Sequence, residues 1–254
     1  MKAMILAAGL GTRLRPLTND RPKALVAVAG HTLLEIALDR LRAVGVREVI
    51  INAHYYREMI VDFLKANNNF DMHIEVSCEK ELLDTGGGLK KAAHFFLDPT
   101  TTEEPFLLHN VDVISTIDLT RMIDFHLKHN ALVTLAVQER ATSRHLLFDE
   151  DGQLCGRRIS RDSNEEAVRN ELVSPVLHQQ PLAFSGIHVI SPRLFAKMTE
   201  EGAFSIIDAY LRLAALGERI VAFRADEYYW RDLGRPESIA QADRDLNNGI
   251  FSLI

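Results

Sequence analysis

The stretch LAAGLGTRLRPLTNDRPKAL, residues 6–25, begins at the end of the apolar run Met4–Leu6 and determines the fold prediction. Gly9 and Gly11 predict a turn after a buried strand, where backbone N–H groups approach an anion closely. Cations follow at defined places, because the rings of two prolines fix φ and stiffen the loop. These residues are Arg13, Arg15, Arg21, Lys23, Pro16 and Pro22. The pattern favours a polyphosphate ligand.

Two familiar phosphate loops do not match this stretch. The dinucleotide pattern G-x-G-x-x-G requires glycine where Leu14 stands, which disfavours an NAD-binding dehydrogenase. The Walker pattern ends in G-K-[S/T], whereas Lys23 lies far downstream and follows proline. An ordinary solvated turn would explain the glycines alone, but the spacing of Arg13, Lys23 and the two prolines argues against it.

Bulk properties exclude several classes of protein. The 254 residues, of which 47% are hydrophobic, suffice for a substantial core. A net charge of −6 argues against nucleic acid or an anionic membrane as the main partner. The sequence has no apolar run of membrane-spanning length and no signal-peptide pattern, so we expect a cytoplasmic protein. Cys78 and Cys155 are isolated and indicate no redox or metal motif.

Strand-like and helix-like stretches alternate through the first half. Strands are expected at residues 3–7, 48–52, 73–77 and 105–109, and helices at 31–43, 55–66, 87–97 and 118–129. This alternation predicts an α/β protein with a Rossmann-like three-layer sandwich and a mixed, mainly parallel central sheet. The glycine turn then lies at the carboxyl end of the first strand, where ligands bind.

From residue 131 the pattern changes. Strands are expected at 131–140, 145–159 with an Asp151–Gly152 hairpin turn, 181–190 and 219–225; a helix at 205–217 starts at Ser205 and ends at Gly217. Residues 160–180 look irregular. Without a linker or repeat, the chain is expected to form a single domain, residues 1–254, whose middle third makes a substrate-side lobe.

Two aspartates follow apolar strands, in PFLLHNVDV (Asp112) and EYYWRDLGRPES (Asp232). Either alone would usually be a surface residue or a helix cap. Together with a phosphate-type loop they predict a divalent cation held by carboxylates and substrate phosphates, as Mg²⁺ usually is.

The segment EKELLDTGGGLKKA, residues 79–92, places three glycines at a helix start. It predicts either a close approach of the backbone to a flat ligand or a flexible helix start. His126 and His129 lack a third metal ligand nearby in sequence, and neither H-E-x-x-H nor G-x-S-x-G occurs.

Taken together, these motifs resemble those of the sugar-1-phosphate nucleotidyltransferase family over nearly the whole chain. The segments that show this resemblance are GLGTRLRPLTNDRPKAL, Asp112, FSGI with Gly186, and WRDLGRPES. Members join a nucleoside triphosphate to a sugar 1-phosphate and release pyrophosphate. DTGGG at 84–88 looks most like the N-acetylmuramate-1-phosphate uridylyltransferases of cell-wall recycling.

The resemblance implies a role for each matching residue. Arg13 and Lys23 would be catalytic and bind the triphosphate, Asp112 and Asp232 would hold Mg²⁺, and Asn110 and Gly186 would contact the sugar. The remaining nucleotide-binding positions would be Ala7, Ala8, Gly9, Gly11, Thr12, Glu79, Thr85 and Gly86. Residues 1–130 would form the nucleotide-binding half, and residues 131–254 the sugar-binding half with the C-terminal metal segment.

Two departures from the family pattern leave the sugar open. Val111 replaces the glycine that normally precedes the metal aspartate, and the usual E-K-P sugar motif is absent from residues 160–180. The base is also open: the acceptor-only carboxylate of Glu79 suits guanine, whereas DTGGG points to uridine. We expect UTP with N-acetylmuramate 1-phosphate first, and GTP with mannose or heptose 1-phosphate second. A non-catalytic nucleotide-sugar sensor is the rival from another class, and a monomer or homodimer is expected.

Overall fold

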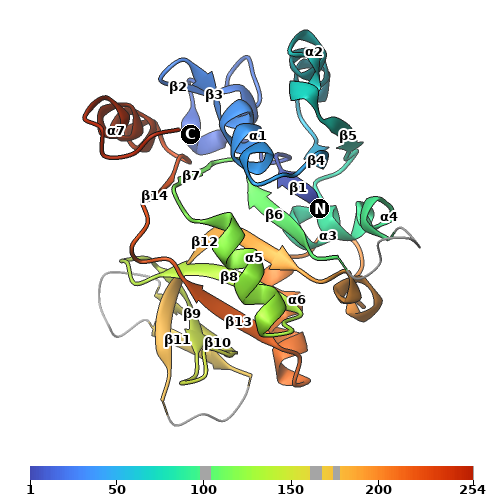
Figure 1. Ribbon diagram of the computed structural model, residues 1–254, viewed down its shortest axis with the longest axis vertical. Coiled ribbons are helices and arrows are strands. Elements are labelled where there is room, and N and C mark those ends of the chain that lie inside the picture. The colour runs from blue at the N-terminus through green and yellow to red at the C-terminus, as the bar shows by residue number, and fades with distance from the viewer. Residues whose placement is uncertain (98–103, 161–167, 174–177, 254) are drawn as a thin grey trace.

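The computed structural model describes residues 1–97, 104–160, 168–173 and 178–253 (Figure 1). Four parallel strands form one half of its central sheet, in the order β6-β1-β4-β5. Their bounds are β1 Lys2–Leu6, β4 Glu48–Ala53, β5 His73–Cys78 and β6 Phe106–Asn110. The strands predicted in the first half are therefore confirmed to within one or two residues.

The other half of the sheet is mainly antiparallel. β12 (Gln180–Ile190) pairs antiparallel with β6, β8 (Val133–Gln138) and β9 (Arg144–Phe148), while β13 (Ile220–Arg224) runs parallel to β8. β9 and β10 (Leu154–Ser160) form the hairpin predicted around Asp151–Gly152. The expected mixed sheet with mostly parallel central strands is confirmed.

The segment 160–180 was expected to be irregular, and this is wrong for its described part. It contains β11 (Val168–Leu172), which pairs antiparallel with β10. A polar edge strand shows little hydrophobic alternation, so pairing with a neighbour decides its conformation. Residues 161–167 and 174–177 lie outside the described residues.

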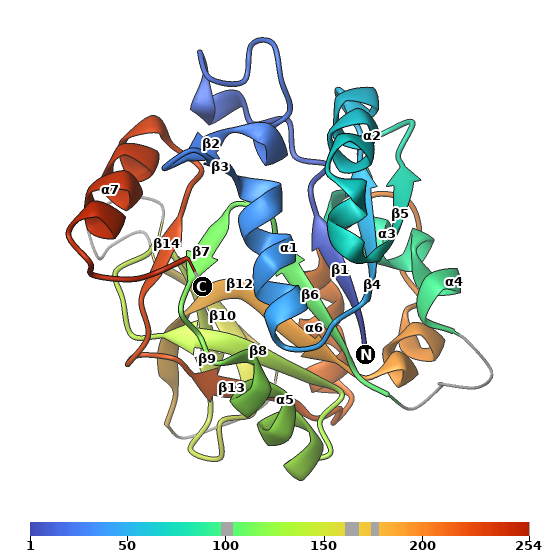
Figure 2. The same ribbon diagram turned by 45° about the horizontal axis from the view of Figure 1, so that its top comes forward.

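Helices cover both faces of the sheet, as Figure 2 shows for α1 lying across β1, β4 and β6. Because side chains alternate along a strand, Ala3 and Ile5 pack on one face and Met4 on the other. The first face is covered by α1 Leu33–Ala43, α2 Arg57–Ala66, α5 Leu119–Lys128 and α7 Pro236–Asn247, and the second by α3 Asp84–Lys91, α4 Ala93–Phe96 and α6 Ile206–Ala215. The predicted three-layer sandwich is therefore confirmed.

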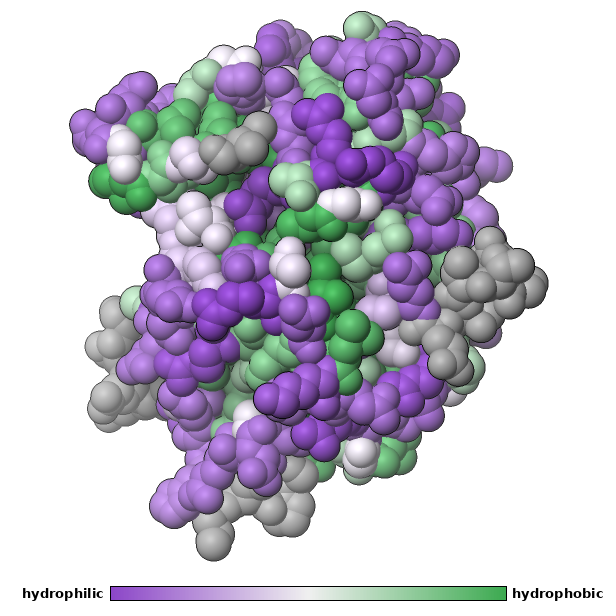
Figure 3. Space-filling model, in the orientation of Figure 1, coloured by the Kyte–Doolittle hydropathy of each residue, from purple (hydrophilic) through white to green (hydrophobic). Residues whose placement is uncertain are grey.

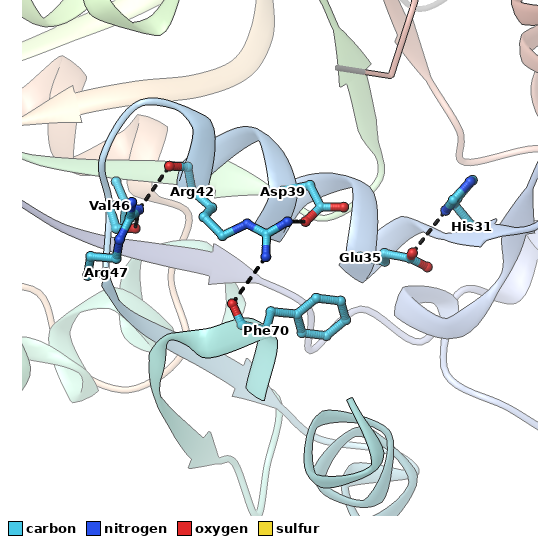
Figure 4. Close-up of polar contacts among 7 residues, drawn as sticks. All are labelled: His31, Glu35, Asp39, Arg42, Val46, Arg47 and Phe70. Atoms are coloured by element: carbon cyan, nitrogen blue, oxygen red, sulfur yellow. Dashed lines mark hydrogen bonds and ion pairs between the residues drawn. The ribbon is translucent and has the colours of Figure 1, made fainter. Parts of the chain in front are cut away.

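The expected helix 31–43 begins two residues late because Thr32 caps it. The Thr32 hydroxyl accepts from the Glu35 N–H, and the Glu35 carboxylate accepts from the Thr32 N–H, which forms a capping box. His31 and Thr32 instead form β3, paired with β2 (Ala27–Val28). Figure 4 shows the other ties of α1: His31 contacts Glu35, Arg42 contacts Asp39 and the Phe70 carbonyl, and Arg47 donates to the carbonyls of Arg42 and Val46.

The sequence pattern also did not predict β7 (Val113–Ser115), β14 (Trp230–Asp232) and α7. β7 and β14 pair antiparallel, and α7 is fastened to β14 because Arg231 and the Tyr229 hydroxyl both donate to Asp245, at 2.8 Å. Strands of three residues are too short to give a hydrophobic period. The pairing of β7 with β14 brings the C-terminal segment to the end of β6.

The space-filling view in Figure 3 is notched at its left edge, between α7 and the lobe of β9–β11, where Figure 1 shows β14. Hydrophilic side chains cover most of α2 and the lower strands on this face (Figure 3). None of the described helices is long and apolar enough to cross a membrane.

Candidate active site

The glycine loop that follows β1 is held by its own contacts. Gly11 has φ +63°, a left-handed conformation that favours glycine, and its carbonyl accepts from the Thr18 hydroxyl at 2.8 Å. A Cβ on Gly11 would lie 3.0 Å from Thr18 Cγ2 and 3.2 Å from Lys23 Cβ. Lys23 then opens a 3₁₀ turn, Lys23–Leu25, directly after Pro22. The loop therefore has one defined path that returns Lys23 to the glycine turn.

A cavity of about 580 Å³, the loop cavity, opens at the carboxyl ends of β1, β4 and β6. Most of the nucleotide-binding residues predicted from sequence line it, together with Asn110 and Asp112: Ala7, Ala8, Gly9, Gly11, Thr12, Arg13, Lys23, Glu79 and Thr85. Gly86 is not among the lining residues. Residues from the first 112 positions, together with Gly234, therefore line one cavity, at the sheet edge where the parallel pattern predicted a ligand.

Charged residues converge at one end of the loop cavity. The Lys23 ammonium forms an ion pair with the Asp112 carboxylate, and both side chains are largely shielded, at 11% and 19% exposed. Asp232 lies opposite Val113 in the β7–β14 pair, so it stands beside Asp112. A Cβ placed on Gly234 would lie 2.7 Å from Asp232 Oδ1, 3.5 Å from Arg13 Nη2 and 3.6 Å from Lys23 Nζ. Two cations and two carboxylates therefore surround one small space, which Gly234 leaves open.

Sequence reasoning missed Asn52 at the end of β4. Its Oδ1 accepts from the Ala7 N–H at 2.7 Å, and its Nδ2 donates to Glu79 Oε1 at 2.8 Å. The other Glu79 oxygen accepts from the Leu83 N–H at 3.1 Å. Glu79 is only 2% exposed. Through Asn52, it connects the ends of β5, β4 and β1 beside the cavity. The available signal was a polar residue closing the apolar run EVIINA.

The three glycines of DTGGG lie within α3 and face protein atoms. A Cβ on Gly86 would lie 2.2 Å from the Phe204 ring, one on Gly87 2.3 Å from the Gly202 carbonyl oxygen, and one on Gly88 2.8 Å from Asn52 Nδ2. The absence of side chains at these positions allows α3 to pack closely against neighbouring segments. The helix accordingly starts at Asp84, earlier than the expected residue 87, and breaks before α4.

A second, larger cavity of about 840 Å³, the basic cavity, lies between β14 and the strands β9, β10 and β12. Arg13 and Asn110 line both cavities, so the two hollows meet there. Gly186 and Asp232 also line the basic cavity. A Cβ on Gly186, whose φ is +76°, would lie 2.8 Å from Val113 Cγ2 and 2.9 Å from Asn110 Nδ2. Only glycine leaves this junction clear.

Asp112 and Asp232 are suited to a hard cation that the protein holds only in part. No group of three or more His, Cys, Asp or Glu among the described residues could hold a metal ion by itself. A cation here would need further oxygens from a bound ligand, and Mg²⁺ commonly binds in this way, through one or two carboxylates and substrate phosphates. His126 instead contacts the Thr134 hydroxyl at 3.0 Å inside the protein.

Comparison with known proteins decides the family. The family model described as "Nucleotidyl transferase" matches residues 2–153, which contain the glycine loop and Asp112. The chain belongs to the nucleotidyl transferase family. The resemblance noted in the sequence is therefore confirmed, and the protein is an enzyme of the nucleotidyltransferase class. In this nucleotidyltransferase Arg13, Lys23 and Asp112 line the loop cavity, and Asp232 lines the adjoining basic cavity.

Several relatives of this nucleotidyltransferase share its full length. It is 34% identical to the N-acetylmuramate alpha-1-phosphate uridylyltransferase of Caulobacter vibrioides, covering 96% of both chains. It is 28% identical to the D-glycero-alpha-D-manno-heptose 1-phosphate guanylyltransferase of Aneurinibacillus thermoaerophilus, covering 98% of this chain and 100% of the other. The crystal structure of HddC from Yersinia pseudotuberculosis superposes with a TM-score of 0.74 at 24% identity, over 96% of this chain and 99% of the other, which shows a shared fold.

Proposed function

We propose that this nucleotidyltransferase uses Mg²⁺ to transfer a nucleotidyl group from a nucleoside triphosphate to a sugar 1-phosphate, releasing pyrophosphate. The observation that carries the proposal is the convergence of Arg13, Lys23, Asp112 and Asp232 where the loop cavity and the basic cavity meet. One cavity would hold the nucleotide and the other the acceptor. Residues 1–130 would then bind the nucleotide, and residues 131–254 would hold the sugar and supply Asp232.

In the reaction, a phosphate oxygen of the acceptor attacks the α-phosphorus in line. A new P–O bond forms while the bond from the α-phosphorus to the bridging oxygen breaks, and pyrophosphate leaves with that electron pair. The acceptor phosphate is already a nucleophile at neutral pH, so the protein needs no strong base. Positioning and charge neutralisation supply the catalysis.

Each of the four charged residues has its own role in this reaction. Arg13 and Lys23 neutralise charge that moves toward the departing pyrophosphate, and the stiff loop holds them in place before the substrate arrives. Asp112 and Asp232 would hold Mg²⁺, which supplies charge stabilisation on the phosphate oxygens. The Lys23–Asp112 ion pair keeps both charges at this point until the triphosphate competes for the ammonium.

UTP and N-acetylmuramate 1-phosphate are the substrates we propose. Support comes from DTGGG and from the relative named as an N-acetylmuramate alpha-1-phosphate uridylyltransferase, which is 34% identical over nearly the whole chain. GTP with mannose or heptose 1-phosphate is the second candidate. Its support is the acceptor-only carboxylate of Glu79 in the loop cavity and relatives named as guanylyltransferases.

Pyrophosphate release tests the proposal. The common nucleoside triphosphates are combined with N-acetylmuramate, mannose and heptose 1-phosphates, with Mg²⁺ and with excess chelator. We expect turnover only with Mg²⁺ and the highest kcat/KM for UTP with N-acetylmuramate 1-phosphate. A tenfold preference for GTP, about 1.4 kcal/mol, would overturn the uridine assignment. No release with any pair would favour the non-catalytic sensor.

A further inference from the structure

Two segments that are distant in the sequence form walls of the loop cavity. The glycine loop contributes residues 7–13, here called the loop wall. The start of α3 and the turn before it contribute Leu82, Asp84 and Thr85, here called the α3 wall. A nucleotide bound in this cavity would contact both walls, so the position of one wall relative to the other affects how tightly it binds.

Asn52 and Glu79 connect the two walls. Asn52 Oδ1 accepts from the Ala7 N–H of the loop wall at 2.7 Å, and Asn52 Nδ2 donates to Glu79 Oε1 at 2.8 Å. The other Glu79 oxygen accepts at 3.1 Å from the N–H of Leu83, which lies between two residues of the α3 wall. A continuous chain of hydrogen bonds through two side chains therefore runs from one wall to the other.

This chain allows only one order of donors and acceptors. The Ala7 N–H can only donate, so the amide oxygen of Asn52 must face it, and the amide nitrogen then faces Glu79. The ionised carboxylate of Glu79 can only accept, which matches Asn52 Nδ2 at one oxygen and the Leu83 N–H at the other. Every group in the chain is thus satisfied.

Both side chains are held beneath the cavity surface, where each is only 2% exposed. The backbone of Glu79 is also fixed, because its N–H donates to the Ala53 carbonyl at 2.8 Å and its carbonyl accepts from His54 Nδ1 at 2.9 Å. Gly88 packs against the pair: a Cβ there would lie 2.8 Å from Asn52 Nδ2 and 2.9 Å from Glu79 Oε1. The two side chains therefore have little room to move.

We infer that Asn52 and Glu79 are a positioning pair: they fix the two walls of the loop cavity relative to each other, and thereby set the affinity for the nucleoside triphosphate without contacting its base. A buried network with every member satisfied holds one geometry, whereas a mismatch leaves a buried group unpaired. The walls can relieve such a mismatch only by moving. This inference rests on the proposed function and assigns positioning residues to its nucleotide site.

The charged residues of the reaction are held by other contacts. The Thr18 hydroxyl donates to the Gly11 carbonyl at 2.8 Å, and Lys23 opens its own 3₁₀ turn and forms an ion pair with Asp112. We therefore expect the positioning pair to act on nucleotide binding and not on the chemical step.

A swap that conserves charge and size tests the inference. Asn52→Asp places an acceptor against Glu79 Oε1, and Glu79→Gln places a donor against Asn52 Nδ2, so each single change creates a mismatch. In the double variant the new amide donates to the new carboxylate, and both ends of the chain still offer acceptors. Each single variant should raise KM for the nucleoside triphosphate at least tenfold, about 1.4 kcal/mol. The double variant should return to within threefold of the wild type, with kcat and the KM for the sugar phosphate nearly constant throughout.

Calorimetric titration with UTP and with GTP measures affinity without turnover. We expect both nucleotides to bind more weakly to each single variant, by the same factor, and both to recover in the double variant. Asn247→Asp and Glu81→Gln are the matched controls, at exposed positions outside both cavities. Asn52→Ala replaces any single variant that does not fold, since it removes both contacts without opposing two like groups. Weaker nucleotide binding by Asn52→Ala supports the pair, and unchanged binding overturns it.

The outcomes separate the two proposals. Normal nucleotide affinity in the folded single variants would overturn the positioning pair, and so would a double variant as impaired as the two single variants combined. A changed ratio of UTP to GTP affinity that persists in the double variant would also overturn it, because Glu79 would then contact the base itself. Absence of turnover with every sugar phosphate would refute the proposed function, and the titrations would still decide the pair. If the wild type bound neither nucleotide, both proposals would fail.

Discussion

Lys23 and Asp112 are 89 residues apart in the chain, yet their side chains form an ion pair at the mouth of the loop cavity. The pairing joins the end of the glycine loop to the turn between β6 and β7. It places a cation and a carboxylate close to the junction of the two cavities.

Asp112→Asn and Asp232→Asn are each expected to lower kcat/KM at least a hundredfold, about 2.7 kcal/mol in the transition state. Each change removes one negative oxygen ligand from the only pair of carboxylates proposed to hold Mg²⁺. Circular dichroism should show an intact fold, and pyrophosphate release gives the rates. Asp62→Asn, at an exposed position on α2, is the matched control. Near-normal turnover in a folded mutant would remove that aspartate from the metal site.

Arg13→Ala is expected to lower kcat more than it raises KM for the sugar phosphate, because its charge counts most as pyrophosphate leaves. Arg13→Lys should restore little if the contact is bidentate. Arg15→Ala is the control in the same loop, since Arg15 is exposed and lines neither cavity. Steady-state kinetics separate the two parameters; an effect confined to KM of the sugar phosphate would disprove the role.

Glu79→Gln is expected to destabilise the protein by about 1–3 kcal/mol. Both carboxylate oxygens accept hydrogen bonds, from Asn52 and from the Leu83 N–H, and an amide would turn one acceptor into a donor facing a donor. Urea denaturation measures the loss, with Glu81→Gln at an exposed neighbouring position as the control. Kinetics with UTP and GTP on the same variant test the base: a shift of preference toward UTP would identify Glu79 as a residue that contacts it.

Gly87→Ala is expected to destabilise the protein even though alanine is the better helix former. A Cβ at this position would lie 2.3 Å from the Gly202 carbonyl oxygen, and such overpacking typically costs about 1–3 kcal/mol against a propensity gain of about 1 kcal/mol. Gly9→Ala serves as the stability control, since nothing lies within 4 Å of its Cβ. A rise in melting temperature for Gly87→Ala would show that α3 packs less closely than the structure indicates.

Acid is expected to weaken the fold through His188. Burial lowers its pKa to about 3, whereas the unfolded chain protonates it near 6.5, so its contribution is complete above pH 6.5 and is lost as pH falls toward 3. From pH 7.5 to pH 5 the loss is about 2 kcal/mol. His188→Gln should therefore flatten the decline of unfolding free energy over this interval, whatever its stability at neutral pH. His73→Gln, at an exposed position, should leave the slope unchanged.

Local signals predicted much of the fold because they require no partner from elsewhere. The buried parallel strands form continuous apolar runs, and Ser205 and Gly217 mark α6 by capping and by a left-handed φ of +84°. β7, β14 and β11 were not predicted, because short or polar strands form only when they pair with residues that are distant in the sequence. The close packing of DTGGG against Phe204 and Gly202 was likewise not predicted, because those residues lie far away along the chain.

The sequence by itself determined the family, the glycine loop with Arg13 and Lys23, and the two aspartates. Short motifs contain these residues, so their chemistry and spacing are visible without the structure. Only the tertiary structure decided that these four residues meet around Gly234, that Asn52 and Glu79 tie strand ends together, and that Arg140 stacks on Trp230 beside a second cavity. The physical reason is that such contacts join residues up to about two hundred positions apart. Their existence depends on strand pairing and on the space left between packed elements, neither of which a local pattern of residues specifies.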